Sequence, residues 1–238
     1  MDLAQLLHPN FDVNPSYFSV NQDFWDKLVK LGSSHLVLPS IHGALLKKKS
    51  LYKIPEDLLL YLEEITKLNE ERNNEILKQI NFISELFIKN QIRHVFLKGA
   101  ALLISEPFNT IGERMVGDID ILVDKDHLIR AKNILIQNHF KTKKIDEVKF
   151  IDKVKGDFSR HLQRLIHPDF IAAVELHEEI LDFKYAKILS AKLILNNTIN
   201  HQGYYVPKRK ILWKHAILNW QYNDKGLLYN DLSFRTFV

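Results

Sequence analysis

Cysteine is absent from the 238 residues of the chain, which excludes disulfides, thiolate nucleophiles and zinc sites built on cysteine. Eight glycines and seven prolines are too few for a linker-rich or collagen-like protein. No apolar run approaches the roughly 20 residues that span a bilayer, and the first residues lack the basic and apolar regions of a signal peptide. We therefore expect a soluble, cytoplasmic protein with no membrane partner.

A strong excess of one charge is also missing. Lysine and arginine number 33 against 29 acidic residues, which gives a net charge of +4. No block of five or six basic residues occurs, so the charge suits a phosphate-bearing ligand without demanding nucleic acid. Hydrophobic residues make up 46% of the chain, which is typical of a globular protein with one large domain or two small ones.

The periodicity of the apolar residues changes near residue 93. Before it, spacings near 3.6 predict helices over 23–31, 33–48 and 55–89, the last opened by Pro55. After it, short runs predict a mixture of strands (92–97, 118–124, 147–151, 159–166 and 170–176) and helices (100–105, 126–138, 183–195 and 212–222). The sequence predicts an α+β fold: a helical N-terminal region over 1–92, a core over 93–180 and a C-terminal helical part over 181–238.

The segment from Gly117 to Val123 carries the most chemical information. Its sequence predicts a strand, in which alternate side chains share a face, so that Asp118 and Asp120 point one way and the branched residues between them point into the core. Two neighbouring carboxylates repel each other unless a cation lies between them. Magnesium is bound by one or two carboxylates together with substrate phosphates. The alternative is an exposed strand face with two solvated acids.

Two further segments add candidate groups. Lys98 and Gly99 follow a predicted strand and open a helix, where free N–H groups bind anions and the lysine adds a positive charge. In a later predicted strand, Glu175 and His177 share a face, so that Glu175 is a candidate third carboxylate. A plain strand-to-helix turn and a salt-bridged edge strand are the respective alternatives.

The order of these segments resembles the nucleotidyltransferase superfamily typified by polymerase beta. The likeness is closer to one branch, the uncharacterised bacterial nucleotidyltransferases with a Leu-Lys-Gly motif. Residues 97–102 (Leu-Lys-Gly-Ala-Ala-Leu) match the opening of that motif, Arg114 and residues 117–123 match its Asp-x-Asp core, and residues 174–177 (Val-Glu-Leu-His) match its later strand. The likeness extends from about residue 23 either to about 180 or to about 222.

The resemblance implies a polymerase-beta-like nucleotidyltransferase core with a small mixed sheet, a helical N-terminal region packed on it, and C-terminal helices. It implies two Mg²⁺ ions on Asp118, Asp120 and Glu175, with an NTP such as ATP as substrate. Glu175 then lowers the pKa of the attacking hydroxyl through the metal or acts as a general base. The product is a nucleoside monophosphate attached to the hydroxyl of a small molecule, sugar, protein or tRNA.

The same resemblance implies binding roles for four further residues. Lys98 and Gly99 are expected to hold the β- and γ-phosphates, Arg114 to bind a phosphate or orient Asp118, and His161 to support Glu175 through a hydrogen bond. Trp213, His215 and Tyr222 either pack between helices or line a base or acceptor pocket.

Two departures from the wider superfamily bear on function. The serine of the usual Gly-Ser turn is absent, because Lys98-Gly99 stands there, as in the branch. Members of the branch often continue with further helices, so we expect a short or truncated C-terminal part. The alternative function is a nucleotide-binding or partner-binding module without turnover, in a toxin–antitoxin or defence pair.

Overall fold

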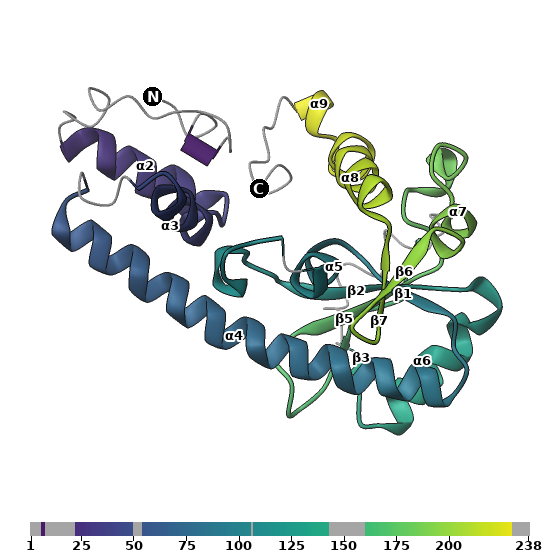
Figure 1. The fold of residues 1–238 in the computed structure, drawn as a ribbon. Helices are drawn as coiled ribbons and strands as arrows, with labels where there is room; N and C mark the ends of the chain where they lie inside the picture. Colours follow the sequence, from purple (N-terminus) through teal and green to yellow (C-terminus); the bar gives the residue numbers. More distant parts are fainter. Residues whose placement is uncertain (1–5, 8–21, 50–53, 106, 143–159, 230–238) are drawn as a thin grey trace, which may run out of the picture. The chain divides into compact units, whose positions relative to one another are not determined.

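A computed structural model describes residues 6–7, 22–49, 54–105, 107–142 and 160–229 (Figure 1). The described residues form two compact units, each considered by itself. The first contains those up to Asn74 together with 107–115, and the second contains 75–105 together with 116–229. The predicted domain boundaries near 92 and 180 remain a prediction, and the predicted strand 147–151 lies outside the described residues.

The first unit is helical. It contains α2 (Gln22–Ser34), α3 (Leu38–Lys47) and the first part of α4 (Glu56–Lys89). Its core consists of apolar side chains from these helices and from the residues next to them, together with Leu6: Trp25, Leu28, Val37, Leu38, Ile41, Leu45, Ile54, Leu58 and Leu62. The predicted end of the first helix at 31 and the predicted start of the next at 33 are wrong, since α2 ends at Ser34 and α3 begins at Leu38. The helix continues to Ser34, because Leu36 takes a positive φ of 56° and the Val37 N–H closes onto the Gly32 carbonyl.

The long helix α4 is unbroken over 34 residues, as the apolar spacing predicts. A polar stretch in its middle does not interrupt it, because two buried asparagines there bind the loop at 107–115. The side-chain nitrogen of Asn69 donates to the carbonyls of Gly112 (2.6 Å) and Arg114 (3.0 Å). That of Asn73 donates to the carbonyls of Ile111 (2.6 Å) and Arg114 (2.7 Å). These polar residues therefore anchor the short 3₁₀ helix η3 (Ile111–Glu113).

The second unit is built on a five-stranded mixed sheet of order β1-β2-β5-β4-β3. The central strands β2 (Asp118–Val123) and β5 (Ala173–His177) are parallel. The short strands β1 (His94–Phe96), β4 (Leu165–Ile166) and β3 (Lys141–Thr142) pair antiparallel with their neighbours. This arrangement confirms the predicted α+β class with a small mixed sheet.

Alternation along β2 separates the two faces of the sheet. Ile119 and Ile121 are completely buried on one face. On the other face Leu122 packs with residues of β1, η7 (Phe183–Tyr185), α7 (Ala191–Leu195) and α8 (Arg209–Leu218). The cluster comprises Val95, Leu97, Leu122, Ile180, Leu181, Leu189, Ala191, Ile194 and Leu195, with Tyr185, Ile211 and Leu218 at its edge. Asp118 and Asp120 alternate with the isoleucines and therefore share the face of Leu122.

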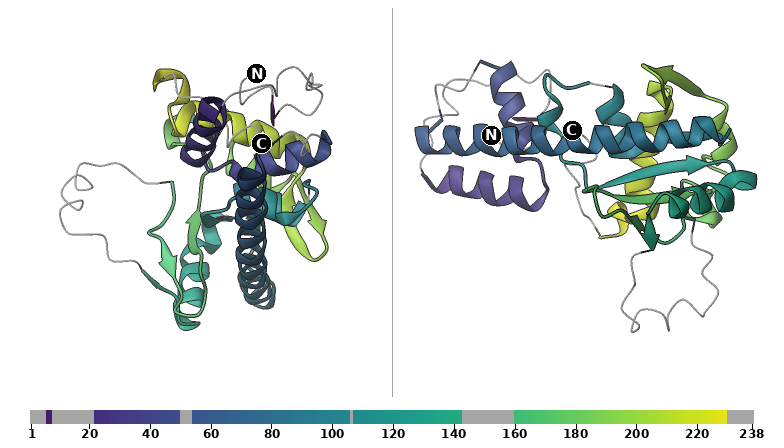
Figure 2. Two further views of the ribbon diagram at one scale, coloured as in Figure 1. Left: turned by 90° about the vertical axis from the view of Figure 1, so that its left-hand side faces the viewer. Right: turned by 90° about the horizontal axis from the view of Figure 1, so that it is seen from below.

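The prediction that the strand around 170–176 is the last one is wrong. A hairpin of β6 (Thr198–His201) and β7 (Tyr204–Pro207) follows it and lies beside the first strand of the sheet (Figure 2). The ring of Tyr205 meets His94 at 5.8 Å, and that of Tyr204 meets Phe96 at 6.5 Å. The turn is made by Gln202 and Gly203, both with positive φ.

Other predicted boundaries shift by a few residues. Helix α5 (Lys98–Ser105) begins at Lys98, and α6 (Leu128–Gln137) is preceded by η4 (Lys125–His127), for which Asp124 rather than Asp126 provides the cap. The helix predicted over 183–195 is divided into η7 and α7, and the last predicted helix continues as η8 (Asn219–Asn223) and α9 (Gly226–Tyr229). Among the described helices, none has the length and apolar character needed to cross a membrane.

Candidate functional site

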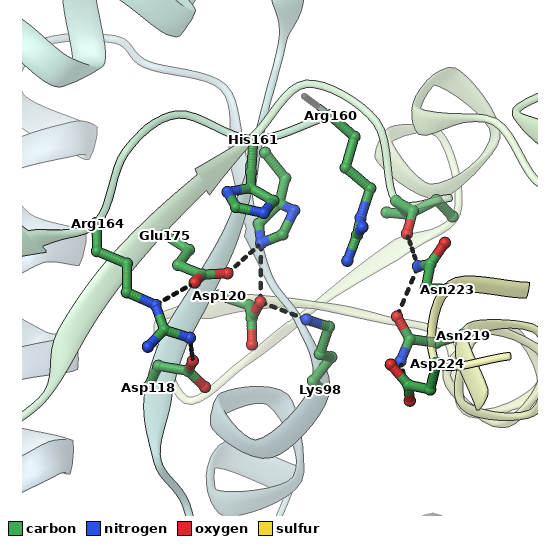
Figure 3. A network of polar contacts seen from close by, with 12 residues as sticks. Lys98, Asp118, Asp120, Arg160, His161, Arg164, Glu175, Asn219, Asn223 and Asp224 are labelled. Atoms are coloured by element: carbon green, nitrogen blue, oxygen red, sulfur yellow. Dashed lines mark hydrogen bonds and ion pairs between the residues drawn. The ribbon is translucent and has the colours of Figure 1, made fainter. Parts of the chain in front are cut away.

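The parallel pairing of β2 with β5 brings the predicted carboxylates together. The register places Asp120 directly beside Glu175. Two residues earlier on each strand, it places Asp118 beside Ala173. Asp120 and Glu175 are only 2% and 6% exposed. The sheet thus collects three acidic side chains on one face, and Figure 3 shows them near one another. This clustering is the arrangement expected from the Asp-x-Asp strand and the later acidic strand.

Lys98 is the first cation of the site. It adopts a left-handed φ of 46° at the start of α5, and its Nζ donates to Oδ1 of Asp120 at 2.6 Å. A non-glycine residue in this conformation carries strain that the surrounding structure must hold. Gly99 follows it in the first turn, where a Cβ would lie 3.1 Å from the side chain of Val116. A larger residue at this position would require the Val116 side chain to shift by a few tenths of an ångström.

His177 contacts two of the acids. The sequence predicts that it shares the face of Glu175 but assigns it no role in the site. Its Nε2 is 2.8 Å from Oδ1 of Asp120 and 3.5 Å from Oε2 of Glu175. Since an ionised carboxylate only accepts hydrogen bonds, Nε2 carries the proton in this arrangement. Its Nδ1 is buried and has no hydrogen-bond partner among the described residues. Its position two residues after Glu175 in the same strand predicted that the two side chains share a face.

Arg164 is the residue that the sequence reasoning missed. The register of β4 on β5 pairs Leu165 with Val174, which sets Arg164 opposite Glu175. Its Nε donates to Oε1 of Glu175 at 2.5 Å, and its Nη2 donates to Oδ2 of Asp118 at 3.0 Å. One guanidinium therefore joins the carboxylates of two adjacent strands (Figure 3).

These contacts set the charge state of the acids. Burial opposes ionisation of Asp120, but hydrogen bonds from His177 and Lys98 outweigh it and hold its pKa below the usual range. Burial also opposes ionisation of Glu175, yet hydrogen bonds from His177 and Arg164 lower its pKa to about 2. Asp118 differs, because burial and then the charges of Asp120 and Glu175 raise its pKa. Asp118 therefore ionises less readily than the other two acids of the cluster.

Two histidines lie close to this cluster. His161 forms an isolated bridge with His177, with ring centroids 5.1 Å apart, and its Nδ1 contacts the carbonyl of Leu162 at 3.0 Å. The hydrogen bonds to Glu175 come instead from His177 and Arg164. His215 on α8 is 1% exposed, and burial followed by the charge of Lys98 lowers its pKa to about 3.

Arg114, Trp213 and Tyr222 complete the set of predicted residues. Arg114 belongs to the first unit, so its role toward a nucleotide stays a prediction. Trp213 is 45% exposed, and both interpretations of this residue remain predictions. The ring of Tyr222 packs on Tyr185 with centroids 4.4 Å apart.

The donor set suits a divalent cation. One ligand atom each from Asp120, Glu175 and His177 lie within 4.8 Å of one another, and all three residues are buried. Carboxylate oxygens are the ligands of Mg²⁺ and Mn²⁺, and an imidazole nitrogen is a ligand that suits transition metals. Burial first, and then the charges of Asp120 and Glu175, raise the pKa of Asp118, and a bound cation would favour its ionised form.

A mixed sheet with buried acids on adjacent parallel strands defines a candidate metal-binding protein of the α+β class. A family model described as an uncharacterised nucleotidyltransferase matches residues 21–226. The match covers most of the chain, which therefore belongs to this nucleotidyltransferase family, and the fold is consistent with that assignment. Searches among curated proteins and among solved structures returned no match.

Proposed function

We propose that this protein is a magnesium-dependent nucleotidyltransferase that transfers a nucleoside monophosphate from an NTP to a hydroxyl of an acceptor. The observation that carries the proposal is the convergence of Asp118, Asp120 and Glu175 from two parallel strands. Membership of the nucleotidyltransferase family supports it. The acceptor class remains a small molecule, sugar, protein or tRNA.

In this proposal Asp118, Asp120 and Glu175 hold the Mg²⁺ ions, and two ions are expected. Bound Mg²⁺ would neutralise the triphosphate and lower the pKa of the acceptor hydroxyl. Glu175 acts as a ligand rather than a general base, because a carboxylate with a pKa of about 2 is a poor proton acceptor at neutral pH.

The N-terminal turn of α5 is proposed to receive the phosphates. Lys98 and the N–H of Gly99 lie in the first turn of this helix, where unpaired N–H groups favour anions. The Lys98 ammonium already contacts Asp120, so a phosphate that approaches this carboxylate also approaches the ammonium. His177 keeps Asp120 in place through its Nε2. Arg114 keeps its proposed role toward a phosphate, whereas His161 acts on Glu175 through its charge rather than through a hydrogen bond.

The experiment is transfer of label from each α-labelled NTP in the presence of Mg²⁺ and a cell lysate, followed by mass spectrometry of the labelled product. Asp118→Asn and Asp120→Asn should each abolish transfer while folding is retained, as checked by circular dichroism. Asp124→Asn is the matched control, because Asp124 follows the same strand and contacts Arg93 instead.

Retained transfer in both active-site variants would overturn the assignment. Binding of NTP without release of pyrophosphate, across a broad panel of acceptors, would favour the binding module without turnover.

A further inference from the structure

Arg164 contacts two of the three carboxylates that the proposed metal site uses. Its guanidinium donates one hydrogen bond to Glu175 and one to Asp118, and its side chain is 51% exposed. A guanidinium fork binds carboxylates and phosphates equally well in geometric terms. The same side chain can therefore serve two different anions without a change of chemistry.

The position of Asp118 gives a second observation. The compact donor group contains Asp120, Glu175 and His177, and Asp118 is held beside it by Arg164. Asp118 can join a shared cation with Asp120 most fully when its Oδ2 is not held by the guanidinium. Metal binding and the Arg164 contacts therefore compete for the same carboxylates.

We propose that Arg164 is an internal counter-ion of the metal-free site that leaves Asp118 and Glu175 for the phosphates of the nucleotide when the divalent cation binds. This inference rests on the proposed function and adds a positioning residue to it. In the metal-free protein Arg164 contacts Asp118 and Glu175 and limits the repulsion between these carboxylates. Once cations neutralise the acids, the freed guanidinium faces the triphosphate that arrives with them.

If the metal and Arg164 compete for the carboxylates, removal of Arg164 should change the affinity for metal and the affinity for the metal–nucleotide complex in opposite directions. Removing Arg164 should strengthen binding of the metal alone, because the carboxylates no longer have a resident cation. The same change should weaken binding of the metal–nucleotide complex, because a phosphate contact is lost. If the ion pairs of Arg164 had only a structural role, removal of Arg164 would not strengthen metal binding.

The test uses the full chain and Mn²⁺ as the metal probe, with free Mn²⁺ measured by electron paramagnetic resonance. Arg164→Gln should bind Mn²⁺ alone about tenfold more tightly than the unmodified protein, the size expected for loss of two half-exposed charge-assisted contacts. With saturating Mn²⁺, an α,β-methylene NTP analogue should bind about tenfold more weakly. Arg93→Gln is the matched control, because Arg93 is 49% exposed and pairs with Asp124.

Arg164→Lys keeps the positive charge but loses the forked guanidinium. Its affinities for Mn²⁺ and for the NTP analogue should lie between those of the unmodified protein and those of Arg164→Gln. If Arg164→Gln does not fold, the binding of Mn²⁺ and of the NTP analogue by Arg164→Lys still tests the inference. Unchanged or weaker Mn²⁺ binding in folded Arg164 variants would overturn the inference while leaving the proposed function standing. Absence of Mn²⁺ binding in every protein, Arg164→Gln included, would overturn both.

Discussion

The ion pair between Lys98 and Asp120 provides a direct measure of how the site is held together without metal. The Lys98 Nζ lies 2.6 Å from Oδ1 of Asp120, and the side chains are 29% and 3% exposed. Lys98→Met keeps the apolar stem and removes the ammonium, so that Asp120 loses one of its two hydrogen-bond donors, the other being His177.

A hydrogen bond to a charged group contributes about 2 kcal/mol. For a chain of this length, 1 kcal/mol corresponds to about 2–4 °C in unfolding temperature. Lys98→Met should therefore unfold about 4–8 °C below the unmodified protein in EDTA at neutral pH, measured by differential scanning calorimetry. The double variant with Asp120→Asn should be more stable than the sum of the single effects predicts, because the unpaired charge is gone.

A divalent cation should replace the missing ammonium. Millimolar Mn²⁺ should raise the unfolding temperature of Lys98→Met by more than it raises that of the unmodified protein. An unfolding temperature of Lys98→Met unchanged in EDTA, or strictly additive effects in the double variant, would refute the view that this contact compensates a buried charge.

Three other variants test separate parts of the structure. Because the folded-state pKa of Asp118 is raised, its ionisation destabilises the fold at neutral pH, so Asp118→Asn should raise the unfolding temperature in EDTA by about 2 °C; a decrease would contradict the repulsion. Because the pKa of buried His215 is about 3, the unfolded chain takes up a proton below about pH 6.5 that the folded protein does not, and this group alone should cost about 2 kcal/mol on going from pH 7 to pH 5. Urea denaturation of His215→Leu should show a loss smaller by that amount, and an equal loss would count against a neutral buried imidazole. In the first unit, Asn73→Leu should cost about 2 kcal/mol by removing two hydrogen bonds, while Asn74→Leu, at an exposed neighbour, should cost much less in the same denaturation assay.

The central acids could be predicted from the sequence because strand alternation is a local property. Asp118 and Asp120 occupy one face and the intervening isoleucine the other, as the two-residue period requires. The proximity of Glu175 could not follow from alternation alone. It depends on the parallel pairing of β2 with β5, a contact between distant segments that only the resemblance to a family suggested.

Arg164 escaped the sequence reasoning for the same physical reason. A strand over 159–166 was predicted, but its pairing partner and register were not, and a shift of one residue would turn Arg164 to the opposite face. The hairpin after β5 was missed because its strands are only half-buried and therefore show no strong apolar alternation. The buried asparagines of α4 read as a polar interruption, since their partners lie on a separate loop.

Binding of Mn²⁺ to the full chain tests the central claim most directly, because it needs neither the acceptor nor the correct NTP. The account predicts that Asp120→Asn weakens Mn²⁺ binding more than tenfold, while Asp124→Asn binds as the unmodified protein does. Equal affinity of all three proteins for Mn²⁺ would show that the acids on β2 and β5 do not form the metal site.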